Sequence, residues 1–358
     1  MNKGTVVVGM SGGVDSSVAA YLLKEQGYNV IGVTMQIWQK ENWNDTADNG
    51  GCCGLSAVDD ARRVANSIGI PHYVMNFRKN FEETVIKYFV NEYKNGRTPN
   101  PCIACNRYVK WEALLNRARQ IGADYIATGH YARIDKHPVT GRYTVKTSVT
   151  AKKDQTYALY NLTQDQLKST LMPVGDYTKD EIREIAKAID VRVASKPDSQ
   201  DICFVPDGDY AKFIEDYDGT KFKCGDFVDM EGNKLGIHKG IIHYTVGQRK
   251  GLGISLGKHA YVYNIDVEKN QVVLCNNEDL FETTVYADNV NFMSVAEINE
   301  PVRAEAKIRY NHTKALCTAS IENGKLKCVF DEPQRAITPG QSMVVYDGDY
   351  ILCGGTII

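Results

Sequence analysis

The sequence predicts an α/β protein: a doubly wound parallel sheet followed by a small central domain and a C-terminal β-barrel. Short apolar runs alternate with amphipathic helical patterns up to about Asp198, glycines recur at short intervals from Phe222 onward, and short alternating runs continue from Thr284 to the end. The 358 residues suffice for two or three domains of about 150 residues each. We expect three domains, at residues 1–206, 207–283 and 284–358.

Strands and helices alternate in the first half of the chain. Four short runs rich in β-branched or aromatic residues predict strands buried on both faces: Thr5–Gly9, Val30–Thr34, His72–Asn76 and Tyr125–Thr128. Amphipathic segments predict four helices: Val14–Gln26, Ala57–Ile68, Phe81–Tyr93 and Tyr108–Gln120. In such a sheet the ligand site lies at the carboxyl ends of the strands.

The last part of the chain predicts antiparallel strands. Short alternating runs mark four of them: Ala304–Ile308, Ala315–Ile321, Leu326–Phe330 and Met343–Tyr346. Asn323-Gly324 stands between two of these runs and suits a two-residue hairpin turn. Repeated short strands of this kind favour a small barrel.

Composition and charge restrict the class of protein. Hydrophobic residues make up 43% and charged residues 24%, which excludes disordered and collagen-like chains. No apolar run approaches the roughly 20 residues of a membrane span, and the N-terminus resembles neither a signal nor a transit peptide, so we expect a cytosolic protein without a membrane partner. The 42 Lys and Arg nearly balance the 44 Asp and Glu. A nucleic acid would therefore have to bind a local basic patch.

The turn after the first predicted strand is suited to binding phosphate. Residues 11–17 read Ser-Gly-Gly-Val-Asp-Ser-Ser and lead directly into a helix. The glycines let the backbone approach an anion, and the helix N-terminus supplies N–H groups that lack helical partners. Asp15 is a candidate magnesium ligand. The turn is neither a Walker A loop nor a Gly-x-Gly-x-x-Gly dinucleotide motif, and a tight turn that only caps a helix is the plain alternative.

Cysteines form the second candidate site. Cys102 and Cys105 lie in a loop containing proline and asparagine, just before the helix predicted near Tyr108, and a helix N-terminus favours the nucleophilic thiolate. Cys203 follows far along the chain. A lone cysteine is usually a small buried hydrophobe. In a cytosolic protein, however, spaced thiols more often bind metal or do chemistry than form disulfides.

These motifs resemble those of a known family. Residues 11–17 match the signature of PP-loop ATP pyrophosphatases, which cleave ATP to AMP and pyrophosphate and adenylate a carbonyl oxygen. With further segments, the chain is similar to tRNA-specific 2-thiouridylases, the MnmA family, which place sulfur on C2 of the wobble uridine of tRNA. These further segments are Gly96–Asn106, Thr128–Tyr131, Lys153–Gln155, Tyr244–Gly253 and Arg309-Tyr310.

The resemblance implies cofactors, partners and site residues. ATP and Mg²⁺ are the implied cofactors, and the implied partners are tRNA and a sulfur donor, either a persulfide carrier or sulfide. The implied ATP-binding residues are Gly9, Met10, Ser11, Gly12, Gly13, Val14, Asp15, Ser16, Met35 and Gly129. The implied target-base residues are Asn100, Pro101 and Cys102, and the implied tRNA contacts are His130, Lys153, Asp154, Gln155, Arg309, Tyr310 and Gln341. Cys105 is implied as the catalytic nucleophile and Cys203 as the carrier of the persulfide.

Cys102 departs from the family pattern, because many members have an aspartate three residues before the nucleophilic cysteine. Cys102, Cys105 and Cys203 could together hold three irons of a [4Fe–4S] cluster whose fourth iron carries sulfur. The same trio with a fourth ligand would suit zinc. The persulfide route and the cluster route are both open on the sequence. The role of Cys52-Cys53, in a predicted surface loop, is open as well.

Two other functions fit parts of the sequence. A PP-loop ligase acting on a small molecule would need an ammonia source, and the sequence has no evident glutaminase signature. A tRNA-binding protein with a structural metal site would not need an intact Asp15 and Ser16. The other cysteines in β-rich segments are most simply structural, namely Cys224, Cys275, Cys317, Cys328 and Cys353.

Overall fold

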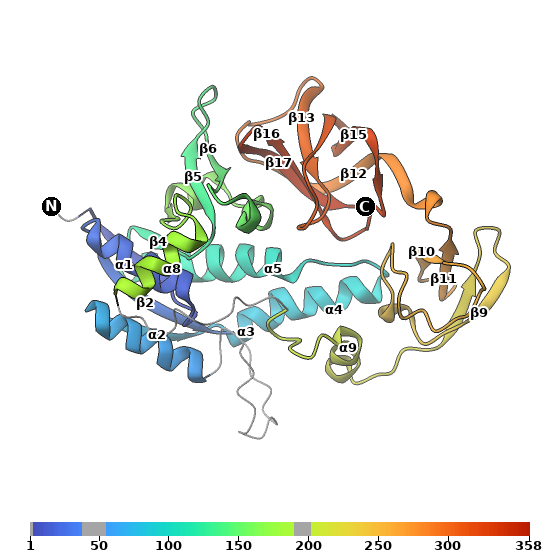
Figure 1. Ribbon diagram of the computed structural model, residues 1–358, viewed down its shortest axis with the longest axis horizontal. Coiled ribbons are helices and arrows are strands. Elements are labelled where there is room, and N and C mark those ends of the chain that lie inside the picture. Colours follow the sequence, from blue (N-terminus) through green and yellow to red (C-terminus); the bar gives the residue numbers. More distant parts are fainter. Residues whose placement is uncertain (1–2, 38–54, 190–201) are drawn as a thin grey trace. The chain divides into compact units, whose positions relative to one another are not determined.

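The computed structural model describes residues 3–37, 55–189 and 202–358 (Figure 1). Cys52-Cys53 and residues 190–201 lie outside this part of the chain. The chain divides into two compact units. Unit 1 comprises residues 1–86, 102–208 and 349–351, and unit 2 comprises residues 87–101, 209–348 and 352–358.

A five-stranded sheet forms the centre of unit 1, and every strand pair in it is parallel, as predicted. Its order is β3-β2-β1-β4-β7. The strands are β1 (Thr5–Gly9), β2 (Asn29–Gln36), β3 (His72–Asn76), β4 (Tyr125–Ala127) and β7 (Thr170–Leu171). Because β1 lies in the middle, the turn after Gly9 opens at the carboxyl edge of the sheet, with strands on both sides.

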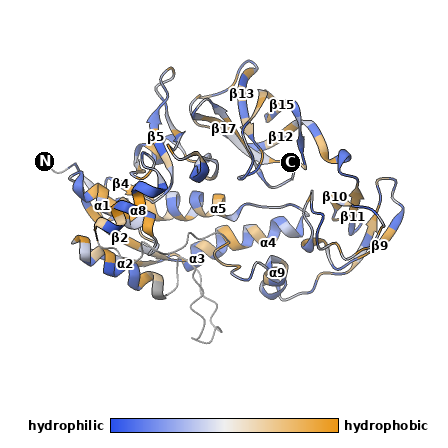
Figure 2. Cartoon of the chain, viewed as in Figure 1, coloured by the Kyte–Doolittle hydropathy of each residue, from blue (hydrophilic) through white to orange (hydrophobic). Residues whose placement is uncertain are grey.

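Three amphipathic helices cover this sheet: α1 (Val14–Glu25), α2 (Leu55–Ile68) and α8 (Lys179–Ala188). Both hydrophobic and hydrophilic residues occur on these helices (Figure 2). Their apolar faces share one buried core with β1, to which Val6, Val18 and Ile182 belong. The core therefore fixes the first turns of α1 and α8, which contain Asp15 and Lys179, beside each other.

The helix that carries Cys102 and Cys105 starts earlier than expected. Residues 101–120 are helical throughout, as α5 (Pro101–Ala104), a π-helical stretch (Cys105–Leu114) and α6 (Leu115–Gln120). The start predicted near Tyr108 is wrong, since Pro101 suits the first position of a helix. Both cysteines thus lie in the helix and not in a loop before it. Trp111 Nε1 donates to Thr170 Oγ1 at 2.8 Å and fixes this helix to β7.

One other expectation for unit 1 needs correction, and one element was missed. β3 is an edge strand and is not buried on both faces, since Tyr73 is 56% exposed. The structure also contains a β-hairpin that the sequence did not indicate, β5 (Ala132–Lys136) and β6 (Tyr143–Thr147).

The remaining helical elements are short. Residues 78–94 form α3 (Arg78–Phe81), a π-helical turn (Glu82–Ile86) and α4 (Lys87–Lys94), and α7 (Gln164–Lys168) precedes β7. Single 3₁₀ turns lie at Ala151–Lys153, Thr156–Leu159, Ile241–His243 and Glu278–Leu280. None of the described helices is long and apolar enough to cross a membrane.

Unit 2 contains a small central sheet in the order β10-β11-β8-β9, next to α9 (Tyr210–Asp218) in the sequence. Its strands are β8 (Gly225–Val228), β9 (Lys234–His238), β10 (Tyr261–Asp266) and β11 (Gln271–Cys275). The ring of Phe227 lies edge-on to those of Tyr244 and His238, at 5.2 and 5.6 Å between centroids. These aromatic contacts give this small sheet its core.

The C-terminal strands of unit 2 form the predicted barrel. They are β12 (Phe281–Phe292), β13 (Val302–Lys307), β14 (Ala315–Glu322), β15 (Lys325–Arg335), β16 (Ser342–Asp347) and β17 (Tyr350–Ile357). Pairing of β12 with both β15 and β17 closes the barrel. Asn323 and Gly324 have φ of 51° and 76°, as the predicted hairpin turn requires. Three cysteines are buried in the barrel, Cys317, Cys328 and Cys353, whereas Cys224 is exposed.

Candidate active site

The turn between β1 and α1 leaves the N-terminus of α1 without a side-chain cap. Gly12 has φ of +69°, and a Cβ there would lie 2.4 Å from the carbonyl oxygen of Ala57, so only glycine fits. Gly13 is the N-cap residue of α1 and has no side chain to cap the first N–H groups of the helix. These N–H groups and the helix dipole are thus available to phosphate.

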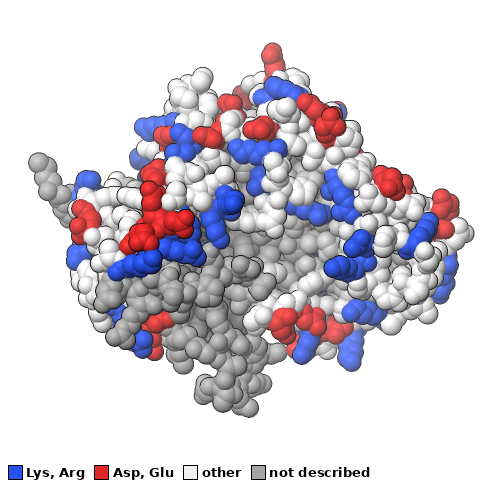
Figure 3. Space-filling model, in the orientation of Figure 1, with Lys and Arg blue, Asp and Glu red and all other residues white. Residues whose placement is uncertain are grey.

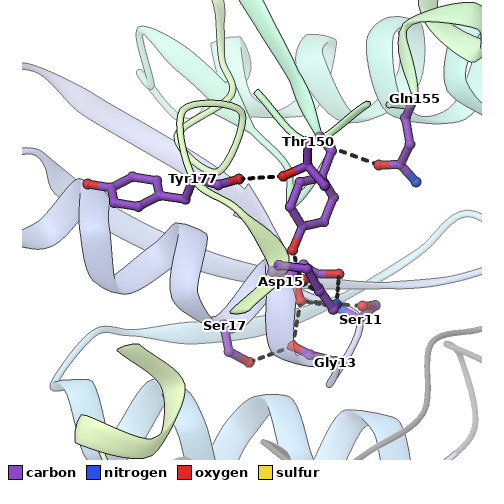
Figure 4. Close-up of polar contacts among 10 residues, drawn as sticks. Ser11, Gly13, Asp15, Ser17, Thr150, Gln155 and Tyr177 are labelled. Carbon is purple, nitrogen blue, oxygen red and sulfur yellow. Dashed lines mark hydrogen bonds and ion pairs between the residues drawn. The ribbon is translucent and has the colours of Figure 1, made fainter. Parts of the chain in front are cut away.

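Serine hydroxyls hold the shape of this turn (Figure 4). Ser16 Oγ and Ser17 Oγ donate to the carbonyl oxygen of Gly13 at 3.2 and 2.8 Å. The N–H of Ser11 donates to Ser16 Oγ at 3.2 Å, and the two hydroxyls of Ser11 and Ser16 lie 3.3 Å apart. Ser16 is buried, so its hydroxyl preorganises the backbone of the turn.

The other residues implied to bind ATP surround this turn. A Cβ on Gly9 would lie 3.8 Å from Met35 Cε, which puts the ends of β1 and β2 side by side. A Cβ on Gly129 would lie 2.6 Å from the N atom of Ser16, so the chain after β4 packs directly on the first turn of α1. The structure therefore brings residues 9–16, Met35 and Gly129 together at the carboxyl edge of the sheet.

Asp15 is paired with a buried lysine. Lys179 Nζ lies 2.7 and 3.0 Å from the two carboxylate oxygens of Asp15, and Tyr131 OH donates to the same carboxylate at 2.8 Å. The side chain of Lys179 is 10% exposed and that of Asp15 28%. Both carboxylate oxygens of Asp15 thus accept hydrogen bonds, from an ammonium and from a phenol hydroxyl.

Sequence reasoning missed Lys179. It is the first residue of α8, which begins with a capping box: Thr178 accepts from the N–H of Glu181, and the Glu181 carboxylate accepts from the N–H of Thr178. The Thr-x-x-Glu spacing could have located this helix start. It could not have shown that Lys179 meets Asp15, because that contact depends on the packing of α8 against α1.

His130, the residue after Gly129, is half-buried and belongs to a polar network. Its Nδ1 lies 2.6 Å from Thr128 Oγ1, and its Nε2 lies 3.4 Å from Lys110 Nζ. Burial, together with the positive charge of Lys110, holds the pKa of His130 well below its usual value, so the imidazole is neutral. Lys110 Nζ also donates to Asn106 Oδ1 at 2.8 Å, which links His130 to the residue after Cys105.

Of the three implied tRNA contacts at residues 153–155, one side chain is exposed and two are half-buried. Gln155 Oε1 accepts from the N–H of Tyr131 at 2.9 Å and Asp154 Oδ2 accepts from the N–H of Ser148 at 3.0 Å, so both side chains hold the fold. Lys153 is exposed, as a phosphate contact requires. Gln155 thus contacts Tyr131, whose hydroxyl donates to Asp15 in the turn between β1 and α1.

The three candidate cysteines all belong to unit 1. Cys102 and Cys203 are exposed and Cys105 is half-buried. Phe204 anchors Cys203, because its ring packs 5.6 Å from that of Phe81. Within the described residues, no three His, Cys, Asp or Glu side chains come close enough to hold a metal ion.

The other implied tRNA and target-base residues belong to unit 2. Asn100 is half-buried and Pro101 is buried. Tyr310 is 38% exposed, with Lys307 Nζ 6.0 Å from its ring. Arg309 and Gln341 instead use their side chains within unit 2: Arg309 donates to Thr338, and Gln341 donates to the carbonyl oxygen of Thr98.

The charge on the visible surface is mixed. In Figure 3, Lys and Arg side chains are interspersed with Asp and Glu, in agreement with 42 basic and 44 acidic residues in the whole chain. A polyanion would therefore be recognised through local contacts such as Lys153 and not through one uniform basic face on this side.

A parallel sheet whose central strand leads through an uncapped glycine turn into a helix defines a nucleotide-binding α/β protein of the PP-loop class. Family models match three consecutive parts of the chain: a tRNA methyl transferase HUP domain at residues 4–207, a tRNA methyl transferase PRC-barrel domain at 211–276 and an aminomethyltransferase β-barrel domain at 282–357.

Relatives match along the whole chain. A tRNA-specific 2-thiouridylase MnmA of Lachnoclostridium phytofermentans is 65% identical over 354 residues, covering 99% of both chains. The proteins of the same name from Clostridioides difficile and Acetivibrio thermocellus are each 58% identical over 358 residues, covering 98% and 100% of those proteins. The chain belongs to the tRNA-specific 2-thiouridylase family.

Proposed function

We propose that this protein uses ATP to activate C2 of the wobble uridine of tRNA and replaces the oxygen there with sulfur. One observation carries the proposal: an uncapped PP-loop lies in the same unit as three accessible or partly accessible thiols. Membership of the 2-thiouridylase family supports tRNA as the substrate. A simple ATP-dependent amide ligase would have no use for these thiols.

The first step is adenylation. Residues 9–16 and Gly129 would bind ATP, with the N–H groups at the start of α1 against its phosphates. The uracil O2 then attacks the α-phosphorus, and pyrophosphate leaves. Asn100, Pro101 and Cys102 would face the target base, which has to leave its stack to reach this site. Lys179 offers a positive charge beside the turn, and no step is assigned here to a magnesium ion.

The second step is sulfur transfer. In the persulfide route, Cys203 carries the terminal sulfur. The thiolate of Cys105 attacks the inner sulfur of this persulfide, which releases hydrosulfide and leaves a Cys105–Cys203 disulfide. Hydrosulfide attacks C2 of the adenylated uridine, and AMP leaves. An external dithiol reduces the disulfide for the next cycle. In the cluster route, Cys102, Cys105 and Cys203 would instead hold three irons of a [4Fe–4S] cluster whose fourth iron carries the sulfur.

The sequence-based domain limits, 1–206, 207–283 and 284–358, are part of the proposal. The residues matched by the three family models, 4–207, 211–276 and 282–357, support them. The cytoplasm, expected from the sequence, is the compartment in which a protein acting on tRNA would meet its substrate. Direct tRNA contacts are proposed for Lys153 and Tyr310, the two most exposed members of the implied set.

The test is an assay of ATP-dependent thiolation of unmodified tRNA by protein purified without oxygen. Wild type is compared with Cys102→Ala, Cys105→Ala and Cys203→Ala, and the iron content of each is measured. Iron-free wild type should form 2-thiouridine and AMP with a persulfide donor, Cys102→Ala should retain the activity, and the other two variants should lose it. A requirement for all three cysteines together with about four irons per chain would establish the cluster route instead.

The same assay separates the proposed function from its rivals. A methyl transfer, which the description of the family model suggests, would incorporate a labelled methyl group from S-adenosylmethionine into tRNA without forming AMP. A small-molecule ligase would form AMP without tRNA. Either result would overturn the proposal.

A further inference from the structure

Thr98 is held by three hydrogen bonds from residues far away in the sequence. Its N–H donates to the carbonyl oxygen of Pro339 at 2.8 Å, and its carbonyl oxygen accepts from Gln341 Nε2 at 2.8 Å. Its hydroxyl donates to Thr245 Oγ1 at 3.2 Å. All these residues belong to unit 2. Thr98 stands two residues before Asn100 and four before Cys102.

The partners of Thr98 are themselves fixed to the barrel. The N–H of Gly340 donates to the carbonyl oxygen of Ile357 at 2.9 Å, and the N–H of Ile357 donates to that of Gln341 at 2.8 Å. Gly340 has φ of +89°, and a Cβ there would lie 2.9 Å from the N atom of Thr98. The close approach of the two segments therefore depends on a glycine.

Thr245 adds an attachment to the central sheet region. Its side chain lies beside the hydroxyl groups of Tyr93 and Tyr210, whose rings stack at 4.7 Å. Arg309 Nη2 donates to the carbonyl oxygens of Val246, at 3.4 Å, and Ala336, so it joins the Thr245 segment to the strand end before Gln341. One network thus connects residues 93–98, 245–246 and 336–341.

We infer that Gln341 is a positioning residue: with Thr245 and Pro339 it holds residues 97–100 in the conformation that presents the target-base segment. We call the network of Thr98, Thr245, Pro339 and Gln341 the Thr98 clamp. The inference rests on the proposed function, in which Asn100 faces the target base. It also gives Gln341 a role other than the direct tRNA contact implied by the family resemblance.

The clamp matters because the reaction needs a fixed geometry. Without these hydrogen bonds a segment outside any helix or strand would sample many conformations, and each ordered residue costs conformational entropy. If residues 97–100 are ordered before tRNA binds, their conformational entropy is not lost during the reaction. Small displacements of a reacting group also lower reaction rates strongly. Loss of the clamp should therefore lower the rate of thiolation at saturating tRNA more than it lowers the affinity for tRNA.

The first experiment needs no activity. Trypsin cleaves after Arg97, the residue before Thr98. We compare the cleavage rate of the Arg97–Thr98 bond in wild type, in Gln341→Ala and in a control, Gln334→Ala, by mass spectrometry of the full-length protein. Gln334 lies in the same barrel and donates to the carbonyl oxygen of Glu332. The Gln341→Ala variant should be cleaved about five-fold faster, the effect of one lost hydrogen bond, and the control should match wild type.

A second pair of variants covers the case in which Gln341→Ala folds poorly. Thr245→Val removes the hydroxyl that accepts from Thr98, whereas Thr245→Ser keeps it. Faster cleavage in Thr245→Val with wild-type cleavage in Thr245→Ser supports the clamp. Equal cleavage rates in all variants would overturn it.

The second experiment separates positioning from tRNA contact. For Gln341→Ala we expect the kcat of thiolation to fall about ten-fold while the Kd for tRNA changes by less than about two-fold. A rise in Kd that accounts for the whole loss of activity would mean that Gln341 binds tRNA, and the inference would be wrong. If wild type forms no 2-thiouridine at all, the proposed function fails, and the trypsin comparison still decides the clamp.

Discussion

The ammonium group of Lys179 lies 2.7 Å from the carboxylate of Asp15 and joins the first turn of α8 to the first turn of α1. The tethered carboxylate belongs to the PP-loop, and the tethering residue comes 164 positions later in the chain. The pair thus fixes the distance between two helix N-termini. The N-terminus of α1 has no side-chain cap, whereas that of α8 is capped by Thr178 and Glu181, so the N–H groups of α1 are the ones open to phosphate.

Replacing this lysine should weaken ATP binding. Lys179→Met keeps the aliphatic chain but removes the charge, so Asp15 loses its cationic partner in a partly buried position. We expect a loss of about 2 kcal/mol of unfolding free energy, less than for a fully buried pair because Asp15 is 28% exposed. We also expect about a ten-fold rise in the Kd for ATP, measured by titration calorimetry.

Lys187→Met is the matched control, because Lys187 lies on the same helix and pairs with the exposed Glu184. It should change neither the free energy of unfolding nor the free energy of ATP binding by more than about 0.5 kcal/mol. Wild-type ATP affinity in Lys179→Met would show that the lysine only supports the fold. A double replacement, Asp15→Asn with Lys179→Met, should cost less than the sum of the two single replacements.

The sequence predicted the part of the site that is local in the chain. The PP-loop, the strand before it and the helix after it follow from glycines, apolar runs and helix periodicity at residues 5–26. The partners of Asp15 could not be found in this way, since Tyr131 and Lys179 reach it only after separate helices and loops pack on the sheet. The same holds for Gln341 and Thr98, which are 243 residues apart.

Boundaries and exposure were the weaker part of the sequence-based prediction. The helix with Cys102 begins at Pro101, because proline is favourable at a first helical position, although the sequence suggested a rigid loop there. β3 has the apolar composition of a central strand, yet it lies at the sheet edge with Tyr73 exposed. Strand order is a tertiary property, so composition alone could not assign this edge.

Gly129 should tolerate no side chain. In Gly129→Ala the new Cβ would lie 2.6 Å from the N atom of Ser16, at the start of the helix that meets phosphate. We expect a loss of about 2–3 kcal/mol of stability from overpacking and loss of most ATP binding, because the first turn of α1 has to move. Thermal unfolding and ATP titration measure both effects.

Gly122→Ala is a useful comparison for this variant. Gly122 has φ of +78° with nothing within 4 Å of a built Cβ, so its replacement causes backbone strain without a clash. It should cost about 1 kcal/mol and leave ATP affinity unchanged. If Gly129→Ala behaved in the same way, close packing at Gly129 would not be what the ATP loop requires.

Stability should fall at acidic pH in a way that depends on His130. Burial and Lys110 lower the pKa of this imidazole, so the folded protein binds fewer protons there than the unfolded chain, whose histidine has the ordinary value of 6.5. The contribution of His130 to stability is therefore complete above about pH 6.5 and is lost as the pH falls below it.

This pH dependence can be measured by denaturant unfolding between pH 7.5 and 5.5. Below pH 6.5, His130 should contribute up to about 1 kcal/mol per pH unit to the fall in the free energy of unfolding. In His130→Gln the free energy of unfolding should therefore depend less on pH than in wild type. His259→Gln, at an exposed loop position, is the control and should follow wild type. Parallel profiles for wild type and His130→Gln would contradict the assignment.

Arg309 should act through the fold and not through tRNA phosphates. Its Nη2 donates to the carbonyl oxygens of Val246 and Ala336 and to Thr338 Oγ1, and it stands at the end of a side chain that is longer than that of lysine. Arg309→Lys keeps the charge, so we expect a loss of about 1–2 kcal/mol of stability with an unchanged salt dependence of tRNA binding.

The exposed Lys153 supplies the contrast, as the proposed phosphate contact in unit 1. Lys153→Ala should leave stability within about 0.5 kcal/mol of wild type and reduce the slope of log K against log salt by about one. Binding isotherms at several salt concentrations measure that slope for both variants. If Arg309→Ala reduced the slope as Lys153→Ala does, while Arg309→Lys kept both slope and stability, Arg309 would be a phosphate contact.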